Sequence, residues 1–257
     1  MFGPALPDLN WVPAPRYILR RDRVLRHLRG AAPCRVLDIG CGPGALISEL
    51  AGRGYDAYGV DGSPTALSLG SHLQRRSPRM ILRAMLDEQW KGTFDLLMSF
   101  EVIEHLEDDV GAMREWRQYL KPGGKMILST PAHPDRWNAA DEWAGHVRRY
   151  ERSQLVRAVE AAGFQVESVE CYGFPLANVM ELLRARAYGK KLATQKAQLS
   201  TEALTGESGS DRSVDTRYWP LYSGFLGRAI MRTFCLIQRP FLKTALGNGF
   251  LVVAKAA

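Results

Sequence analysis

The sequence predicts an α/β fold, a doubly wound and mostly parallel sheet, from three observations. Short apolar runs, which are typical of buried parallel strands, alternate with segments of helical periodicity. The first such run, residues 36–39, ends in a glycine turn at residues 40–44. An amphipathic segment, residues 45–50, follows the turn directly. Strand, glycine turn and helix in this order commonly begin an α/β domain that binds a nucleotide-like ligand.

The glycine turn, Gly40-x-Gly42-x-Gly44, is suited to holding a ligand against the backbone. Glycine has no Cβ, so it adopts positive φ and lets a ligand approach closely. The helix that follows offers free N–H groups to a polar or anionic group. Asp38 lies inside the strand just before the turn, where a buried carboxylate requires a partner. We therefore expect Asp38, Cys41 and the three glycines to contact a cofactor.

A second strand-like run, residues 57–60, ends in Asp61 and Gly62. An acidic residue about 20 positions beyond the glycine turn holds a ribose in nucleotide-binding α/β folds. A carboxylate suits a diol because it can accept both hydroxyl hydrogens at once. We therefore expect Asp61 and Gly62 at the ribose of the cofactor. The turn lacks the G-x-G-x-x-G spacing of the dinucleotide fingerprint, which argues against NAD.

Five further strands are predicted at residues 80–85, 93–100, 125–129, 164–171 and 249–254. Helices are predicted at residues 17–28, 64–75, 112–120 and 154–162. These elements divide the chain into an N-terminal arm with a basic helix (1–30), a core (31–173), a helical insertion (174–247) and the last strand of the core (248–257).

The insertion has three parts of different composition. Residues 174–199 predict a basic helix, residues 200–216 are polar and predict a loop, and residues 218–246 are apolar and aromatic with interspersed basic residues. Two interpretations of the last part remain open. It is either a lid that packs on the core or an amphipathic segment that lies on a membrane or admits a lipid-like acceptor.

The chain of 257 residues carries a net charge of +7 and has a sequence pI of about 9.4. This excess is compatible with nucleic acid, anionic lipid or an acidic small substrate as partner, and it selects none of them. Arginines of the helix at 17–28 carry much of the charge and could face solvent or contact phosphate.

The cysteine pattern and hydropathy predict a cytoplasmic protein. The four cysteines are scattered without metal-ligand spacing, so reduced thiols are expected. We identify no signal peptide, and no apolar run reaches the roughly 18 residues that a spanning helix needs. The oligomeric state is left open by the sequence.

Acid and base residues follow the fourth strand, at the edge where parallel sheets bind ligands. Glu101, Glu104 and His105 have the spacing i, i+3, i+4, so a helix would place them on one face, where they could hold a divalent metal. His105 titrates near neutral pH and could serve as a general base.

Residues 37–44 resemble the first motif of the class I S-adenosylmethionine-dependent methyltransferases, which have a Rossmann-like fold. By this resemblance the glycine turn lies against the methionine part of S-adenosyl-L-methionine, and Asp61 holds the ribose. Glu101 lies near this cofactor. The sixth and seventh strands of that family form a nearly direct antiparallel pair, completing a seven-stranded sheet. The insertion at 174–247 is this chain's main departure from the family.

Residues 101–105 resemble the Glu-x-x-Glu-His stretch of ubiquinone-pathway O-methyltransferases and of small-RNA terminal 2′-O-methyltransferases. In both families these residues can ligate a metal, and His146 matches the place of a further histidine in the RNA enzymes. The same pattern recurs in relatives without a metal, so a divalent metal is not favoured and our prediction assigns no metal ligand. The resemblance implies Glu104, His105 and His146 as catalytic residues.

We therefore expect a transferase that methylates a hydroxyl of a small-molecule or lipid-like natural product in a biosynthetic pathway. RNA 2′-O-methylation is the first alternative, favoured by the basic pI and by the histidines. A cofactor-binding scaffold protein without catalysis is the second. Peripheral membrane contact through residues 218–246 is considered alongside the first hypothesis.

Overall fold

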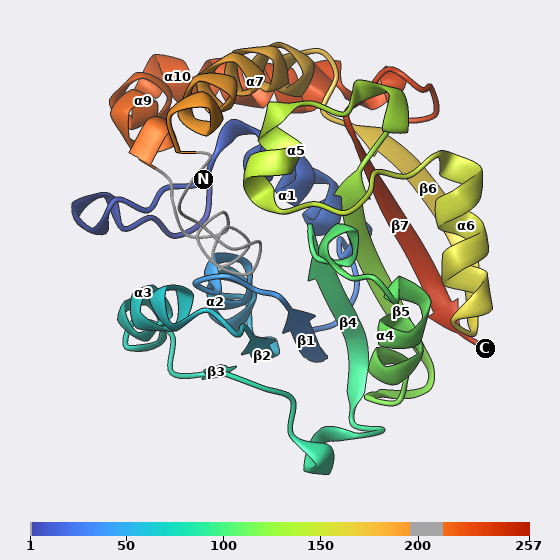
Figure 1. Cartoon of the computed structure of the whole chain (residues 1–257). Helices are drawn as coiled ribbons and strands as arrows, with labels where there is room; N and C mark the ends of the chain where they lie inside the picture. The colour runs from blue at the N-terminus through green and yellow to red at the C-terminus, as the bar shows by residue number, and fades with distance from the viewer. Residues whose placement is uncertain (1, 196–212) are drawn as a thin grey trace.

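The computed structural model describes residues 2–195 and 213–257, and it has the predicted doubly wound α/β fold (Figure 1). One seven-stranded sheet has the order β3-β2-β1-β4-β5-β7-β6. Strands β1 to β5 pair in parallel, and β7 pairs antiparallel with both β5 and β6. The strands are β1 (Arg35–Ile39), β2 (Asp56–Val60), β3 (Met80–Arg83), β4 (Phe94–Phe100), β5 (Leu120–Pro131), β6 (Phe164–Tyr172) and β7 (Gly249–Ala256).

Helices cover both faces of the sheet, and successive strand residues feed two separate cores. Val36 and Met98 pack in the core under α1 and α2, whereas Leu37 and Leu97 pack under α4 and α6. This alternation follows from the period of two in a strand, and it explains why the strands are apolar throughout. The α-helices are α1 (Pro15–His27), α2 (Ala45–Gly52), α3 (Pro64–Gln74), α4 (Asp109–Arg117), α5 (Ala139–Ala144), α6 (Arg152–Ala161), α7 (Leu176–Gln195), α9 (Ser213–Ser223) and α10 (Phe225–Ile237).

The predicted helix at 112–120 is displaced towards the N-terminus in the structure. Asp108 caps it by accepting from the amide of Gly111 at 2.8 Å, so α4 begins at Asp109. Strand β5 begins at Leu120 rather than at Lys125, because Leu120 pairs with Phe94 before the register shifts. The turn that was expected to separate helix and strand is therefore part of the strand.

The N-terminal arm is packed against the protein rather than simply extended. Residues Pro7–Leu9 form a 3-10 turn, η1, closed by a bridge between Leu6 and Trp11. Trp11 and Val12 are buried, and Tyr222 of α9 donates to the carbonyl of Pro13 at 3.2 Å. The proline-rich composition of residues 1–15 favours an extended backbone, but composition does not show that the apolar side chains of the arm have a binding surface.

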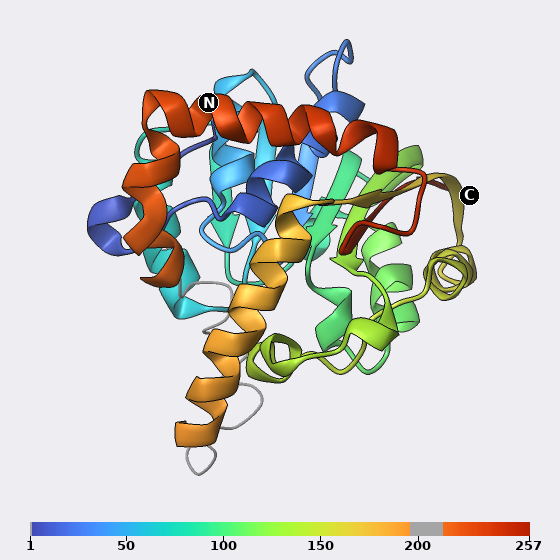
Figure 2. The same ribbon diagram turned by 90° about the horizontal axis from the view of Figure 1, so that it is seen from above.

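The insertion between β6 and β7 forms a cap over the carboxyl ends of the parallel strands (Figures 1 and 2). Its described elements are α7, α9, α10 and the 3-10 turn η5 (Arg239–Phe241). Most of the predicted polar loop at 200–216 lies outside the described residues, and α9 begins at Ser213. None of the described helices combines the length and the hydropathy needed to cross a membrane.

Candidate active site

The glycine turn joins β1 to α2 in a conformation that requires glycine. Gly40, Gly42 and Gly44 have φ of 71°, 56° and 75°, in the left-handed region. The amide of Gly40 donates to the carbonyl of Val60 at 2.8 Å, and the amide of Gly42 donates to Asp61 Oδ2 at 2.7 Å. The turn is therefore tied to the end of β2.

The three glycines differ in what a side chain would meet. A Cβ on Gly40 would lie 2.3 Å from Val102 Cγ2, and one on Gly44 would lie 2.4 Å from Met80 Cε. A Cβ on Gly42 or on Gly62 would have no described atom within 4 Å. Gly40 and Gly44 thus allow close packing, whereas Gly42 and Gly62 border open space. This is the cradle that a cofactor would fill.

Two carboxylates flank this cradle, as the sequence predicted. Asp38 is buried and, among the described residues, its Oδ1 has no hydrogen-bond partner. Burial raises the pKa of Asp38 to about 7, against the opposing effect of Arg20. Asp61 accepts from the amides of Gly42 and Ser63, so both of its oxygens are oriented by the turn. Each oxygen retains a lone pair for a further donor.

Cys41 lies within the turn, but its thiol is directed away from the cradle. A Cβ on Gly59 of β2 would lie 2.7 Å from Cys41 Sγ, so the sulfur packs against that strand. Burial raises the pKa of this thiol well above its usual value. A contact from Cys41 to a cofactor would therefore come through its backbone.

Glu101 follows β4 and is held by two arginines of α1. Arg16 pairs with it at 2.8 Å and Arg20 at 3.4 Å, and it also accepts from Ser129 Oγ at 2.8 Å and Tyr172 Oη at 3.1 Å. Burial opposes ionisation, but the two arginines prevail and the pKa of Glu101 falls to about 2. Glu101 is thus a charged acceptor at the edge of the cradle.

The sequence missed this role of α1. Arg16 and Arg20 are spaced i, i+4, so they share the helix face that turns towards Glu101. Arg21 pairs with a carboxylate of α2, and Arg23 with one of β6. The spacing indicated a common face, but only the tertiary structure shows that the face turns inward.

The prediction that Glu101, Glu104 and His105 share one helical face is wrong. The helical turn after β4, η3 (Ile103–His105), is a 3-10 turn of three residues, and Glu101 precedes it with φ of 60°. Glu101 therefore points towards α1, whereas Glu104 and His105 belong to a different cluster.

Glu104 is fully buried at the centre of this second cluster. Its Oε2 accepts from Thr130 Oγ1 at 3.1 Å. Its Oε1 has no hydrogen-bond partner in the described part of the chain, and His146 Nε2 lies 4.0 Å from it. Burial, with the nearby charge of Glu101, raises the pKa of Glu104 well above its usual value. A cation beside Glu104 would oppose this shift.

The rings of His105 and His146 meet edge to face with centroids 4.8 Å apart. His105 Nδ1 lies 3.3 Å from the carbonyl of Gly145, and His146 Nδ1 lies 2.9 Å from Asp141 Oδ1. Carbonyl and carboxylate oxygens only accept, so each Nδ1 carries the proton and each Nε2 keeps its lone pair. Burial and the neighbouring His146 lower the pKa of His105 to about 4.

Asp141 was not predicted from the sequence, although it orients His146. It lies in the first turn of α5, and Arg149 holds it through two hydrogen bonds of 2.7 and 2.8 Å. These donors outweigh burial and lower the pKa of Asp141 to about 2, so the carboxylate stays charged. A signal was present, because Asn138 followed by Asp141 is a capping box at the start of a helix.

The second cluster also fits a divalent metal. Glu104, His105 and His146 each offer one ligand atom, and these atoms all lie within 4.8 Å of one another. The unpartnered Oε1 of Glu104 and the two free Nε2 atoms are the donors that a transition metal prefers. Glu101 does not belong to this set. A bound metal would polarise an acceptor hydroxyl.

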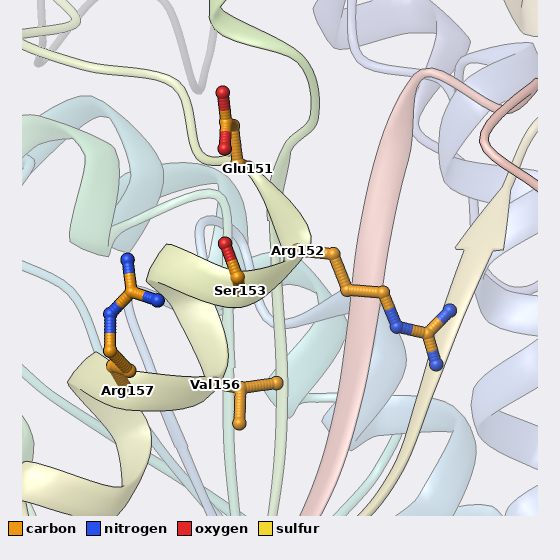
Figure 3. Close-up of a pocket in the computed structure, with 5 residues that line it drawn as sticks. All are labelled: Glu151, Arg152, Ser153, Val156 and Arg157. Atoms are coloured by element: carbon orange, nitrogen blue, oxygen red, sulfur yellow. The ribbon is translucent and has the colours of Figure 1, made fainter.

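A separate surface depression lies on α6 and takes no part in either cluster (Figure 3). It has a volume of about 570 Å³ and is lined by Glu151, Arg152, Ser153, Val156 and Arg157. These residues belong to the first turns of one helix and its cap, and Arg152 donates to the carbonyl of Val169 at 3.1 Å. The chemistry-bearing residues lie instead at the carboxyl ends of β1, β2, β4 and β5.

A family model described as a methyltransferase domain matches residues 15–169, which is more than half of the chain. The chain belongs to this methyltransferase family. The matched range includes the glycine turn and both site clusters, and it excludes the cap. The expectation drawn from residues 37–44 is therefore confirmed at the level of the family.

Named relatives and solved structures agree with this assignment. The ubiquinone biosynthesis O-methyltransferase of Pseudomonas aeruginosa strain UCBPP-PA14 is 35% identical over 106 residues, 39% of this chain and 46% of that protein. The enzyme of the same name from Acinetobacter baumannii strain ACICU is 30% identical over 118 residues, 44% of this chain and 50% of that protein. The chain thus spans about half the length of the curated relatives it matches.

The solved structures support the fold alone, because their sequences are distant. A putative sarcosine dimethylglycine methyltransferase from Galdieria sulphuraria superposes with a TM-score of 0.59 at 13% identity, covering 100% of this chain and 92% of that one. The [4+2]-cyclase SpnF superposes with a TM-score of 0.58 at 16% identity, covering 93% and 81%. A cyclase among these neighbours shows that the fold does not by itself determine the reaction.

Proposed function

We propose that this protein transfers a methyl group from S-adenosyl-L-methionine to a hydroxyl oxygen of a small, lipid-like acceptor. The observation that carries the proposal is the buried cluster of Glu104, His105 and His146 beside an open glycine cradle. The names of the curated relatives support oxygen as the methylated atom and a lipid-like acceptor. The cradle residues support the cofactor.

The cradle would bind the cofactor in two parts. Gly42 and Gly62 leave the space, Asp61 offers its carboxylate to the ribose, and Asp38 and Glu101 offer carboxylates to the polar methionine end. When bound, S-adenosyl-L-methionine supplies the methyl group as a sulfonium electrophile. The protein's own contribution is to orient the acceptor, exclude water and receive a proton.

His146 is the general base in this proposal. Its Nδ1 proton is held by Asp141, so Nε2 presents a lone pair next to Glu104. The acceptor oxygen forms a bond to the methyl carbon, the carbon–sulfur bond breaks, and the hydroxyl proton moves to His146 Nε2. Asp141 stabilises the imidazolium that results, because it carries a negative charge 2.9 Å from Nδ1.

His105 and Glu104 position the acceptor in the same proposal. The lowered pKa of His105 favours the neutral ring, whose Nε2 accepts, and the raised pKa of Glu104 favours the protonated carboxyl, which can donate. Two hydroxyls of one acceptor would therefore find complementary groups. The reaction needs no metal, although a divalent ion held by Glu104, His105 and His146 would lower the pKa of the acceptor hydroxyl.

RNA 2′-O-methylation remains an alternative with less support than the sequence gave it. The sequence favoured it through the basic pI and the histidines, and the basic helix was one surface that could contact phosphate. In the structure, α1 turns Arg16, Arg20, Arg21 and Arg23 towards carboxylates of the protein. These side chains are not free to contact phosphate. A scaffold role is the second alternative, and the open cradle with its oriented Asp61 supports binding without deciding turnover.

Incubation with methyl-labelled cofactor tests the proposal. Phenols with and without an isoprenoid chain, and RNA, are offered as acceptors. The product is treated with alkali, which cleaves a methyl ester and leaves a methyl ether intact. An ether-linked label on the lipid-like phenol is expected. Label on RNA alone would favour the first alternative, and cofactor binding without transfer to any acceptor would favour the scaffold. We also propose peripheral membrane contact through residues 218–246, the apolar and basic part of the cap.

A further inference from the structure

The outer surface of the cap is the most apolar exposed surface of the described residues. Within residues 2–195 and 213–257, fifteen large hydrophobic side chains are exposed, and eleven of them belong to the insertion. They are Val179, Leu182, Leu183, Tyr218, Leu221, Phe225, Leu226, Ile230, Leu236, Ile237 and Leu246. Single exposed hydrophobic residues are normal on a protein surface, but such a concentration on one element marks an interaction surface.

Helix α10 shows how this surface arises. Its inner face packs through Met231, which is buried against Ile18 of α1 and Phe2 of the N-terminal arm. Gly227, also buried, packs closely on Leu221 and Tyr222 of α9. Its opposite face exposes Phe225 (93%), Leu226 (71%) and Ile230 (47%). Helical spacing puts these apolar positions on the arc that α1 leaves uncovered. The helix is therefore apolar on both sides, and only one side has a partner among the described residues.

Helix α7 adds a second apolar stripe to the same side of the molecule. It packs on α1 and α5 through its inner face, where Ala177 and Tyr188 are buried. Val179, Leu182 and Leu183 are exposed at half or more of their surface. Seen from above the strand ends, α7, α9 and α10 all lie in front of the sheet (Figure 2). Their outer faces thus form one platform over the site.

The charged side chains of α10 and of the described segment between α10 and β7 are all basic. No acidic residue follows Asp215 in the sequence, whereas Arg217, Arg228, Arg232 and Lys243 are exposed. The acidic residue of α7, Glu181, turns inward and pairs with a buried arginine, Arg149, at 2.6 Å. Long basic side chains that flank exposed apolar residues are typical of helices that lie at the surface of an anionic bilayer.

We propose that the outer faces of α7 and α10 dock onto a membrane that contains anionic phospholipid. Phe225, Leu221 and Leu226, at the junction of α9 and α10, enter the acyl boundary, and Arg228 and Arg232 meet lipid phosphates. The carboxyl ends of the strands lie beneath this platform, so docking places the site next to the source of a lipid-like acceptor. The inference adds a partner to the proposed function, and it extends the contact surface from residues 218–246 to α7.

Vesicle co-sedimentation tests the inference without cofactor, acceptor or turnover. The full chain is mixed with vesicles of phosphatidylcholine alone and of phosphatidylcholine with phosphatidylglycerol. Binding to the anionic vesicles is expected, and it should weaken as salt is raised. The double change Phe225→Glu and Leu226→Glu should reduce the partition coefficient by about tenfold or more. Arg228→Gln should reduce it by roughly fivefold.

Met85→Glu is the matched control, because Met85 is 75% exposed and lies outside the insertion. It should bind vesicles as the unchanged protein does. Thermal stabilisation by S-adenosylhomocysteine, measured in parallel, shows that each variant is folded and tests the cofactor proposal separately. Protein that binds vesicles but no S-adenosylhomocysteine would overturn the proposed function and leave this inference standing.

Three results would overturn the membrane inference. In the first, the unchanged protein sediments with neither vesicle, and in the second, the Phe225→Glu and Leu226→Glu variant binds as well as the unchanged protein. In the third, sedimentation velocity shows that the unchanged protein self-associates and that Phe225→Glu abolishes the self-association, while the unchanged protein does not bind vesicles. That result would mean that a second copy of the chain covers the platform.

Discussion

Alanine substitutions in the glycine turn separate the structural role of one glycine from the cofactor role of another. Gly40 and Gly42 both have positive φ, at 71° and 56°. A Cβ on Gly40 would lie 2.3 Å from Val102 Cγ2, whereas one on Gly42 would project into open space. The two variants should therefore fail in different ways: Gly40→Ala in stability, and Gly42→Ala in cofactor affinity.

The expected magnitudes follow from these contacts. The left-handed conformation costs alanine about 1–2 kcal/mol, and the reduced freedom of the unfolded chain returns about 0.4–1 kcal/mol. Gly42→Ala should thus lose about 1 kcal/mol, or about 2–4 °C in melting temperature. Gly40→Ala adds an overpacking term of about 1–3 kcal/mol, for a total of about 2–4 kcal/mol.

Differential scanning fluorimetry and calorimetric titration with S-adenosylhomocysteine measure the two effects. Gly42→Ala should weaken the affinity by about tenfold or more, because its methyl group would occupy space that the cofactor needs. Gly40→Ala should retain more affinity at a temperature where it is folded. Gly52→Ala is the control, since Gly52 ends α2 with negative φ and an alanine there meets no described atom within 4 Å. Wild-type affinity in Gly42→Ala would refute the placement of the cofactor.

Three further predictions concern the carboxylates and the buried cluster. Because burial raises the pKa of Asp38 to about 7, its folded form resists ionisation, and the stability it contributes at pH 4 is lost as the pH rises towards 7. Asp38→Asn should remove this decline, which is on the order of 2–4 kcal/mol in the free energy of unfolding measured with urea between pH 4.5 and 7.5. An unchanged slope of that free energy against pH would contradict the assignment. Asp141→Asn should lower kcat by about 10²-fold or more with unchanged S-adenosylhomocysteine affinity, since the orienting charge on His146 is lost. An equal loss of affinity would indicate a collapsed site instead. Chelation of divalent ions should leave the affinity for S-adenosylhomocysteine unchanged, because Glu104, His105 and His146 lie outside the glycine cradle. Weaker S-adenosylhomocysteine binding in calorimetry after chelation would show that this cluster and the cradle are coupled.

The glycine cradle could be predicted from sequence because its geometry is local. Gly40, Gly42 and Asp61 belong to two consecutive strand ends, so the residues that define the cradle are close in the chain. The parallel sheet followed from apolar runs alternating with helical periods. The antiparallel pairing of β6 with β7 came from the resemblance to the family, because more than seventy residues separate the two strands. The position of β7 between β5 and β6 was not predicted.

The second cluster could be predicted only in part. Glu104, His105 and His146 were named, but the helical spacing that linked Glu101 to them was misleading, because η3 is a short 3-10 turn. Asp141 reaches His146 across a helix cap and a loop, and Arg16 reaches Glu101 across 85 positions of the chain. Neither pairing leaves a periodic trace in the sequence. Contacts of this kind depend on how elements pack.

The partial burial of the cap also lay beyond sequence reasoning. Composition allowed both a lid and a membrane surface for residues 218–246, and the structure contains features of each. Met231 packs inward as a lid residue would, while Phe225 remains 93% exposed. Periodicity gives the two faces of a helix, but the choice of the buried face is made by α1, which is distant in the chain.

The most direct test of the central claim is the pH dependence of methyl transfer to a phenolic acceptor by the unchanged protein and by His146→Ala. Both proteins should bind S-adenosylhomocysteine equally. If His146 takes the proton, His146→Ala should transfer about 10²- to 10⁴-fold more slowly at pH 7 and should recover as the pH approaches the phenol pKa of about 10. Equal rates for the two proteins at pH 7 would contradict the account, because the proton would then leave by a route that does not involve His146.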